Sequence, residues 1–165
     1  MTFKGKFPRL GKGCFLASGA WLIGDITCGE ESSFWFNVVV RGDVNQVSIG
    51  NRTNIQDGTV VHVTSGTAPT HIGSNVTIGH GAIIHGCTIE DHCLIGMGSK
   101  ILDGAKIRQH SFVAAGSLVT PGKEFPEKSM IMGAPAKAVR MLTDAEIQSI
   151  AASAQHYVDT MRGYQ

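Results

Sequence analysis

Aliphatic residues recur at every sixth position through the middle of the chain, with a small residue usually at the fifth position of each block. This period fits neither an amphipathic helix, with its repeat of about 3.6 residues, nor a half-buried strand, which alternates at every second residue. It predicts a short strand followed by a corner, three of which make a triangular coil of about 18 residues that stacks on the next coil. The blocks open at Ile49, Ile55, Val61, Ile72, Ile78, Ile84, Ile89, Ile95, Ile101, Ile107 and Val113.

The same frame continues toward the N-terminus with one residue missing, so that the predicted solenoid has about six coils. Two blocks, after Val44 and after Ile84, have five residues instead of six. The earlier blocks open at Val44, Val38, Ser32, Ile26 and Ala20.

A different pattern begins after residue 142. Thr143 and Glu146 have the spacing of a helix capping box, and the residues that follow predict a helix with one apolar face. We therefore expect one domain in which residues 1–142 form the solenoid and residues 143–165 form a helix packed along it or against a neighbouring subunit. The predicted apolar face consists of Ile147, Ile150, Ala151, Ala154, Tyr157, Val158 and Met161.

Composition supports a mostly β protein with many tight turns, because glycine accounts for 21 of the 165 residues and Ile and Val outnumber Leu. The net charge of +1 gives no electrostatic footprint for nucleic acid or for an anionic membrane. No apolar run approaches the roughly 20 residues of a membrane span. We expect a soluble, cytoplasmic protein whose four cysteines are reduced structural thiols.

Three of the seven histidines stand out by their place in the repeat: His62, His80 and His85. With three units per coil, their positions predict that His62 and His80 lie on the same side of adjacent coils, and that His85 lies on the next side at nearly the same height. Three imidazoles are the ligand set of an open zinc site, with the fourth position left for water. Side chains on two sides of a filled prism need not converge, so a site shared between the subunits of a cyclic trimer is the alternative.

The ordered motifs around these histidines resemble those of the γ-class carbonic anhydrases, which are hexapeptide-repeat proteins. The motifs are Arg41-Gly-Asp-Val-Asn45, Thr53-Asn-Ile-Gln-Asp57, His62-Val, Ile78-Gly-His80 and Ile84-His-Gly-Cys87. The resemblance implies a left-handed parallel β-helix over roughly residues 14 to 120, in an all-β fold with a C-terminal α-helix. It also implies a homotrimer with Zn²⁺ at each interface, Fe²⁺ or Co²⁺ being possible as well, and the reversible hydration of CO2 to bicarbonate by metal-bound hydroxide.

The resemblance also assigns roles to individual residues of this chain. It implies that His62 and His85 of one subunit and His80 of the next hold the metal. Gln56 is expected beside the metal-bound water or bicarbonate, and Arg41, Asp43 and Asp57 are expected to form an ion network between subunits. Gln56, Asn45 and Tyr157 are the predicted catalytic residues. Asn45 is expected to hydrogen-bond near the cleft between subunits, and Tyr157 resembles the tyrosine that some family members bring to the metal pocket, although capping of a corner and packing of the helix explain these two residues equally well.

The chain departs from the family pattern where the prototype carries acidic residues that move protons to solvent. The segment from Val63 to Thr70 contains no acid, and Val44 follows Asp43 where a glutamate would be expected. Since fast hydration needs a proton relay, we expect a slow hydratase. Three alternatives remain open: a metal-dependent thioesterase acting on an acyl-CoA, a non-catalytic metal-binding assembly protein, and a hexapeptide acyltransferase.

Overall fold

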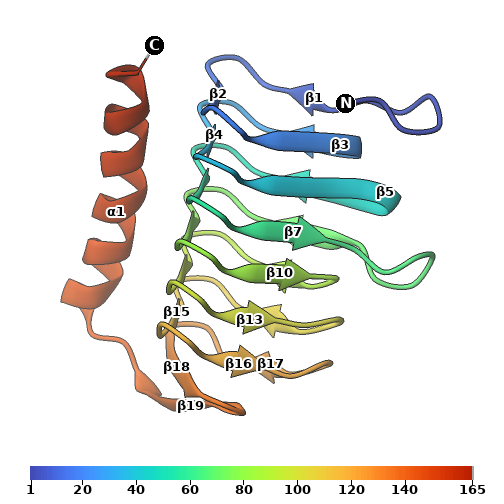
Figure 1. Ribbon diagram of the computed structural model, residues 1–165. Helices are drawn as coiled ribbons and strands as arrows, with labels where there is room; N and C mark the ends of the chain where they lie inside the picture. The colour runs from blue at the N-terminus through green and yellow to red at the C-terminus, as the bar shows by residue number, and fades with distance from the viewer. Residues whose placement is uncertain (165) are drawn as a thin grey trace.

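The computed structural model describes residues 1–164 as a stack of coils with one long helix beside it (Figure 1). Strands of successive coils pair in parallel, so each side of the stack is a sheet. The predicted parallel β solenoid with a C-terminal helix is confirmed. We name its three sides A, B and C, and strands β3 and β5 cross the corner between A and B.

The strands divide among the three sides as follows. Side A contains the first parts of β3 (Trp21–Cys28) and β5 (Val39–Ile49), then β7 (Val60–His62), β10 (Ile83–His85), β13 (Lys100–Ile101) and β16 (Leu118–Val119). Side B contains β1 (Arg9–Leu10), the second parts of β3 and β5, β8 (Thr70–Ile72), β11 (Thr88–Ile89), β14 (Lys106–Ile107) and β17 (Glu124–Phe125). Side C contains β2 (Phe15–Leu16), β4 (Ser33–Phe34), β6 (Asn54–Ile55), β9 (Thr77–Ile78), β12 (Leu94–Ile95), β15 (Phe112–Val113), β18 (Ser129–Gly133) and the antiparallel β19 (Ala136–Met141).

The interior is the column of aliphatic residues that the repeat predicts. Ile55, Ile84 and Ile101 are fully buried, like the other block-opening residues of the central coils. The small residues at the fifth position stand at the corners, where Thr59 Oγ1 donates to the carbonyl of Gly79 at 3.0 Å. Over residues 1–164, no buried side-chain nitrogen or oxygen lacks a hydrogen-bond partner. The core is therefore apolar along its axis, and the buried polar side chains at its corners are all hydrogen-bonded.

The frame predicted for the N-terminal coils is wrong by two positions. Val40 stacks on Val61, and Phe34 stacks on Ile55, whereas the predicted blocks open two residues earlier, at Val38 and Ser32. Val44, which was also predicted to open a block, is 44% exposed. Val40 and Phe34 on the strands and Val38 and Ser32 at the corners are all buried. Burial pattern alone therefore did not show which of the two sets stacks on the strands of the next coil. The structure has about seven turns rather than six, because β1 and β2 form a turn before Ala20, where the first predicted block opens.

Helix α1 (Asp144–Arg162) lies along side C. It begins at the predicted capping box, in which the Thr143 side chain accepts from the backbone of Glu146. The predicted apolar face is largely confirmed, with Ile150, Ala154, Val158 and Met161 buried, but Ala151 is exposed and residue 165 lies outside the described residues. Aromatic rings fix the far end of the helix, since Tyr157 packs edge-on against Trp35 with centroids 5.6 Å apart.

One loop interrupts the coils, between β7 and β8. Thr64 and Ala68 pair across its base, and the loop extends from the corner between sides A and B (Figure 1). Across residues 1–164, no helix has the length and apolarity needed to cross a membrane.

Removing one large residue from the axial column should destabilise the whole stack. Ile84 is fully buried, so Ile84→Ala should lower the free energy of unfolding by about 2–5 kcal/mol. Val44 is 44% exposed, and Val44→Ala should change stability by less than about 0.5 kcal/mol. Urea unfolding at one fixed protein concentration measures both, and equal effects would contradict the assignment of the column.

Candidate metal centre

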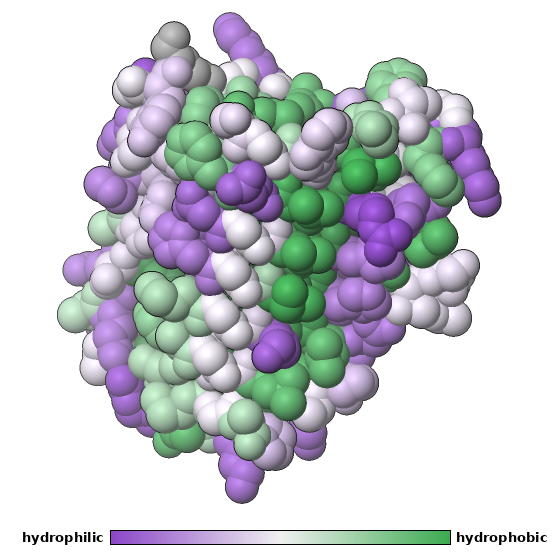
Figure 2. All heavy atoms as spheres, in the orientation of Figure 1, coloured by the Kyte–Doolittle hydropathy of each residue, from purple (hydrophilic) through white to green (hydrophobic). Residues whose placement is uncertain are grey.

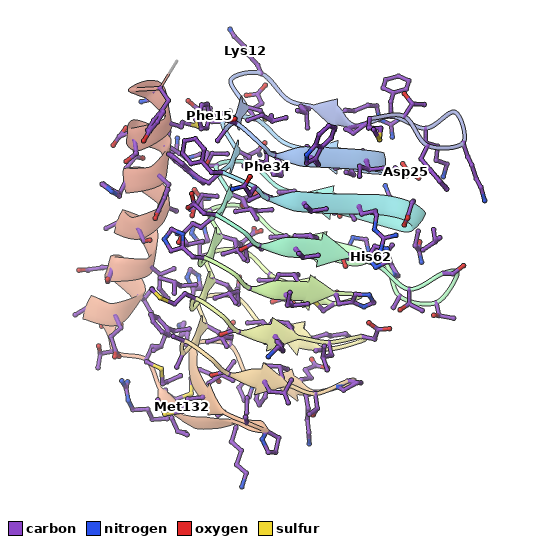
Figure 3. The ribbon with its side chains drawn as sticks, viewed as in Figure 1. Lys12, Phe15, Asp25, Phe34, His62 and Met132 are labelled. Carbon is purple, nitrogen blue, oxygen red and sulfur yellow. The ribbon has the colours of Figure 1, made fainter. Side chains whose placement is uncertain are left out.

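His62 and His85 lie next to each other at the corner between sides A and B. Strands β7 and β10 pair in register, so His85 stacks directly on His62. The two ring centroids are 5.1 Å apart, and His62 Nδ1 lies 3.2 Å from His85 Nε2. Figure 3 marks His62 beside the loop that follows β7.

This arrangement corrects the prediction that His62 shares a side with His80. The two stacked histidines are separated by 23 residues, because the loop after β7 lengthens that coil beyond the regular 18 or so residues assumed in the count. The pair His62 and His85 therefore occupies one side, and His80 lies elsewhere.

A carboxylate holds the outer nitrogen of each ring. Asp43 Oδ1 lies 3.1 Å from His62 Nε2, and Asp103 Oδ1 lies 2.5 Å from His85 Nδ1. Because an ionised carboxylate only accepts hydrogen bonds, each outer nitrogen carries the proton. The two inner nitrogens then face each other with their lone pairs.

Two facing lone pairs need a cation or a shared proton between them. Two imidazole nitrogens bound at about 2.0–2.1 Å to one tetrahedral zinc ion would be roughly 3.3 Å apart, close to the 3.2 Å observed here. The donor set and its spacing therefore fit a transition-metal ion. A guanidinium nitrogen of Arg41 also lies 3.5 Å from His62 Nδ1.

His80 lies at a different corner, between sides C and A, where its Nδ1 is 2.8 Å from Asp57 Oδ2. Both side chains are well exposed, at 48% and 42%. Within residues 1–164 of one chain, no three histidine, cysteine, aspartate or glutamate side chains form a complete ligand group. One chain thus brings together two of the three predicted ligands, and the role of all three as ligands stays a prediction.

The two carboxylates differ in what holds their second oxygen. Asp43 Oδ2 accepts from Arg41 at 2.5 Å, whereas Asp103 Oδ2 accepts from the hydroxyl of Thr64 at 2.5 Å. Burial by itself would raise the pKa of Asp43, but the hydrogen bonds from His62 and Arg41 outweigh it and hold the pKa below its usual value. The hydrogen bonds from Thr64 and then His85 lower the pKa of Asp103.

Gln56 is buried and belongs to a chain of hydrogen bonds that starts at α1. Ser153 contacts Thr77 Oγ1 at 3.3 Å, and Asn54 Nδ2 donates to the same hydroxyl at 2.9 Å. Gln56 Nε2 in turn donates to Asn54 Oδ1 at 3.1 Å. Within residues 1–164, the amide oxygen of Gln56 accepts no hydrogen bond and is available to accept one.

Gln56 and His80 line a cleft of about 330 Å³ between side C and α1. Its other walls include Met97, Phe112 and Tyr157, and the predicted place of Tyr157 in the metal pocket stays a prediction. Burial raises the pKa of Tyr157, with a smaller contribution from Asp57. The amide of Asn45 donates to the carbonyl of Thr64 at 3.0 Å, which secures the loop after β7, and the predicted role of Asn45 near the cleft between subunits stays a prediction.

Asp103 and Thr64 are the site residues that the sequence analysis missed. Asp103 stands at a corner of the repeat, where aspartate is common for reasons of turn geometry. The only sequence signal for Asp103 is its spacing from His85. Asp103 follows His85 by 18 residues, which is the length of one regular coil, and so lies one coil further along the stack.

Comparisons with known proteins identify the family and the fold of the chain. The family model described as bacterial transferase hexapeptide (six repeats) matches residues 69–101 and 86–121. A probable carbonic anhydrase of Methanocaldococcus jannaschii is 54% identical over 158 residues, covering 94% of this chain and 99% of the other. The chain belongs to the γ-class carbonic anhydrase-like family.

Other members of this family and fold extend the comparison. The mitochondrial gamma carbonic anhydrase 2 of Arabidopsis thaliana is 49% identical over 93% of this chain, and the chain spans 57% of its length. A Bacillus cereus crystal structure titled as a putative acetyltransferase is 41% identical, with a TM-score of 0.95 over 99% of this chain and 94% of the other. The γ-class carbonic anhydrase-like fold is therefore shared by proteins that carry different functional names.

The facing imidazoles predict that a metal ion stabilises the protein. Zn²⁺ at about 100 times its dissociation constant should add roughly 2.7 kcal/mol to the free energy of unfolding. His62→Ala and His85→Ala should abolish most of this gain in calorimetry. His92→Ala should retain it, because His92 stacks on His110 at a separate corner. An equal zinc effect in all four proteins would contradict the assignment.

Proposed function

We propose that the protein is a metal-dependent hydratase of the carbonic anhydrase type, interconverting CO2 and bicarbonate as a homotrimer. His62 and His85 of one subunit and His80 of the next would hold the metal ion, for which Zn²⁺ is the first candidate and Fe²⁺ or Co²⁺ the others. The observation that carries the proposal is the pair of facing imidazole nitrogens, each ring backed by a carboxylate. The names of the relatives support the reaction.

The surface around the histidine pair supports a second copy of the chain as the source of the third ligand. Outward residues of side A stack into an apolar column on the strands that carry His62 and His85. Figure 2 shows this column as a green band down the front of the molecule. An apolar band of this kind favours a protein interface. Its members are Trp21, Val39, Val60, Ile83 and Leu118, with Lys100 between the last two.

The chemistry of the site divides between the metal ion and the side chains. A zinc ion with three imidazole ligands lowers the pKa of bound water to about 7 and so supplies hydroxide at neutral pH. The free amide oxygen of Gln56 can accept a hydrogen bond from a hydroxyl group and fix its orientation. The apolar wall formed by Met97, Phe112 and Tyr157 suits an uncharged substrate such as CO2.

The proposed ion network contributes orientation rather than chemistry. Asp43 holds the ring of His62 and is itself held by Arg41, and Asp57 holds the ring of His80. A carboxylate bound to the outer nitrogen fixes the tautomer and the direction of a ligating imidazole. Since the loop 63–70 has no acid, proton release to solvent would depend on the buffer, and a low turnover is expected.

Mixing two inactive variants tests the shared site. Neither His80→Ala nor His85→Ala can form a complete site alone. In trimers assembled randomly from equal amounts of both, about one quarter of the interfaces would join an intact pair to an intact His80. Zinc content and stopped-flow CO2 hydration should therefore recover to about one quarter of the wild-type values. Absence of any recovery after subunit exchange would show that the interfaces do not complete the site, and it would overturn the proposal.

A metal-dependent thioesterase acting on an acyl-CoA is the second candidate. The cleft of about 330 Å³ has room for about ten water molecules, which is much more than CO2 requires. Its apolar wall would suit the hydrocarbon part of an acyl group, and the similar structure titled as a putative acetyltransferase favours acyl chemistry.

A substitution that fills the cleft distinguishes the thioesterase from the CO2 hydratase. If the protein is a thioesterase, Met97→Trp should fill the cleft and lower the hydrolysis of butyryl thioesters at least tenfold while leaving zinc content unchanged. Met132→Trp is the control, because Met132 is exposed on β18 away from the cleft lining. CO2 hydration without thioester hydrolysis would exclude the second candidate. Metal binding without either activity would indicate an assembly protein.

A further inference from the structure

We propose that Asp103 and Thr64 form a clamp that positions His85 for metal binding, so that both are positioning residues of this site. The inference rests on the proposed function, since it assumes that His85 is a metal ligand. The clamp consists of two hydrogen bonds through one carboxylate. Thr64 Oγ1 donates to Asp103 Oδ2, Asp103 Oδ1 accepts from His85 Nδ1, and both distances are 2.5 Å.

The clamp determines which nitrogen of His85 is available. With the proton of His85 on Nδ1, the lone pair of Nε2 points toward His62. Without Asp103, the ring could rotate or carry its proton on Nε2, and a protonated nitrogen cannot bind a metal. Asp103 therefore selects both the tautomer and the direction of the ring.

The backbone at this corner leaves space for the carboxylate. Gly86 directly follows His85 and has a φ of +55°. A Cβ at Gly86 would lie 2.5 Å from Asp103 Oδ1 and 2.8 Å from the Cβ of Ala68. The absence of a side chain at Gly86 is thus what lets Asp103 rise from its own coil to reach His85.

Thr64 is itself fixed, so it can fix Asp103. Its backbone nitrogen donates to the carbonyl of Ala68 at 2.9 Å, and its carbonyl accepts from Asn45 Nδ2 at 3.0 Å. The loop after β7 therefore contributes directly to the site. It brings a hydroxyl to the second oxygen of Asp103, as Arg41 brings a guanidinium to the second oxygen of Asp43.

The two halves of the site differ in charge as a result. Arg41 neutralises Asp43, whereas the hydroxyl of Thr64 leaves the full negative charge on Asp103. A carboxylate with uncompensated charge increases the electron donation of the imidazole that it binds. The two carboxylates therefore place different net charges behind the two rings.

The test is the zinc affinity of the full-length protein, measured by competition with a chromophoric chelator. Asp103→Asn should raise the dissociation constant about 10- to 100-fold, and Thr64→Val should raise it by a smaller factor. Thr64→Ser, which keeps the hydroxyl, should restore wild-type affinity. Asp25→Asn is the matched control, because Asp25 (labelled in Figure 3) is a β3 carboxylate that pairs with Lys6 at 2.6 Å rather than with a histidine.

Two further readouts separate positioning from general stability. The thermal midpoint of the metal-free protein should be the same for wild type and Thr64→Val. The visible spectrum of the Co²⁺-loaded protein should change in Asp103→Asn, because it reports the ligand geometry. Equal zinc affinity in wild type, Asp103→Asn and Thr64→Val would overturn the clamp and leave the proposed function intact. A wild-type protein that binds no stoichiometric zinc would overturn both.

Discussion

Register between successive coils is the constraint on which the rest of this structure depends. Parallel strands in neighbouring coils lie about 4.8 Å apart, so two residues at the same position of consecutive coils must stack. His62 and His85 follow this rule, with ring centroids 5.1 Å apart. A solenoid can therefore supply half of the proposed metal site by repeating one residue at one corner, provided that the register is kept.

Stacking alone would only place two imidazole rings one above the other. The carboxylates of Asp43 and Asp103 orient these rings as the proposed metal site requires. Asp43 and Asp103 hold the two rings from opposite ends, so that both lone pairs point inward. Such an arrangement is unfavourable for the protein alone, because two acceptors face each other at 3.2 Å and the guanidinium of Arg41 approaches His62 Nδ1 only to 3.5 Å. The apolar column inside the coils stabilises the fold independently of the corner that carries His62 and His85. The fold can therefore keep two facing imidazole acceptors at this corner.

The sequence predicted the architecture well because the repeat is a direct record of packing. The six-residue period, the capping box at Thr143 and Glu146 and most of the apolar face of α1 are all visible as local patterns. The sides of the histidines were wrongly predicted because the count assumed coils of constant length, and the loop after β7 breaks that assumption. Asp103 was missed for a related reason: the period gives the corner of a residue, but not the direction of its side chain.

The position of His80 can be understood from which sides of the solenoid α1 covers and which it leaves open. Helix α1 covers side C, whereas side A leaves its outer apolar column open along the strands that carry His62 and His85. His80 stands at the corner between these two sides, with nearly half of its side chain exposed. In the proposed trimer, side A of one subunit would meet this corner of the next. Burial of the apolar column and completion of the ligand set would then be the same event, so metal binding and assembly would stabilise each other.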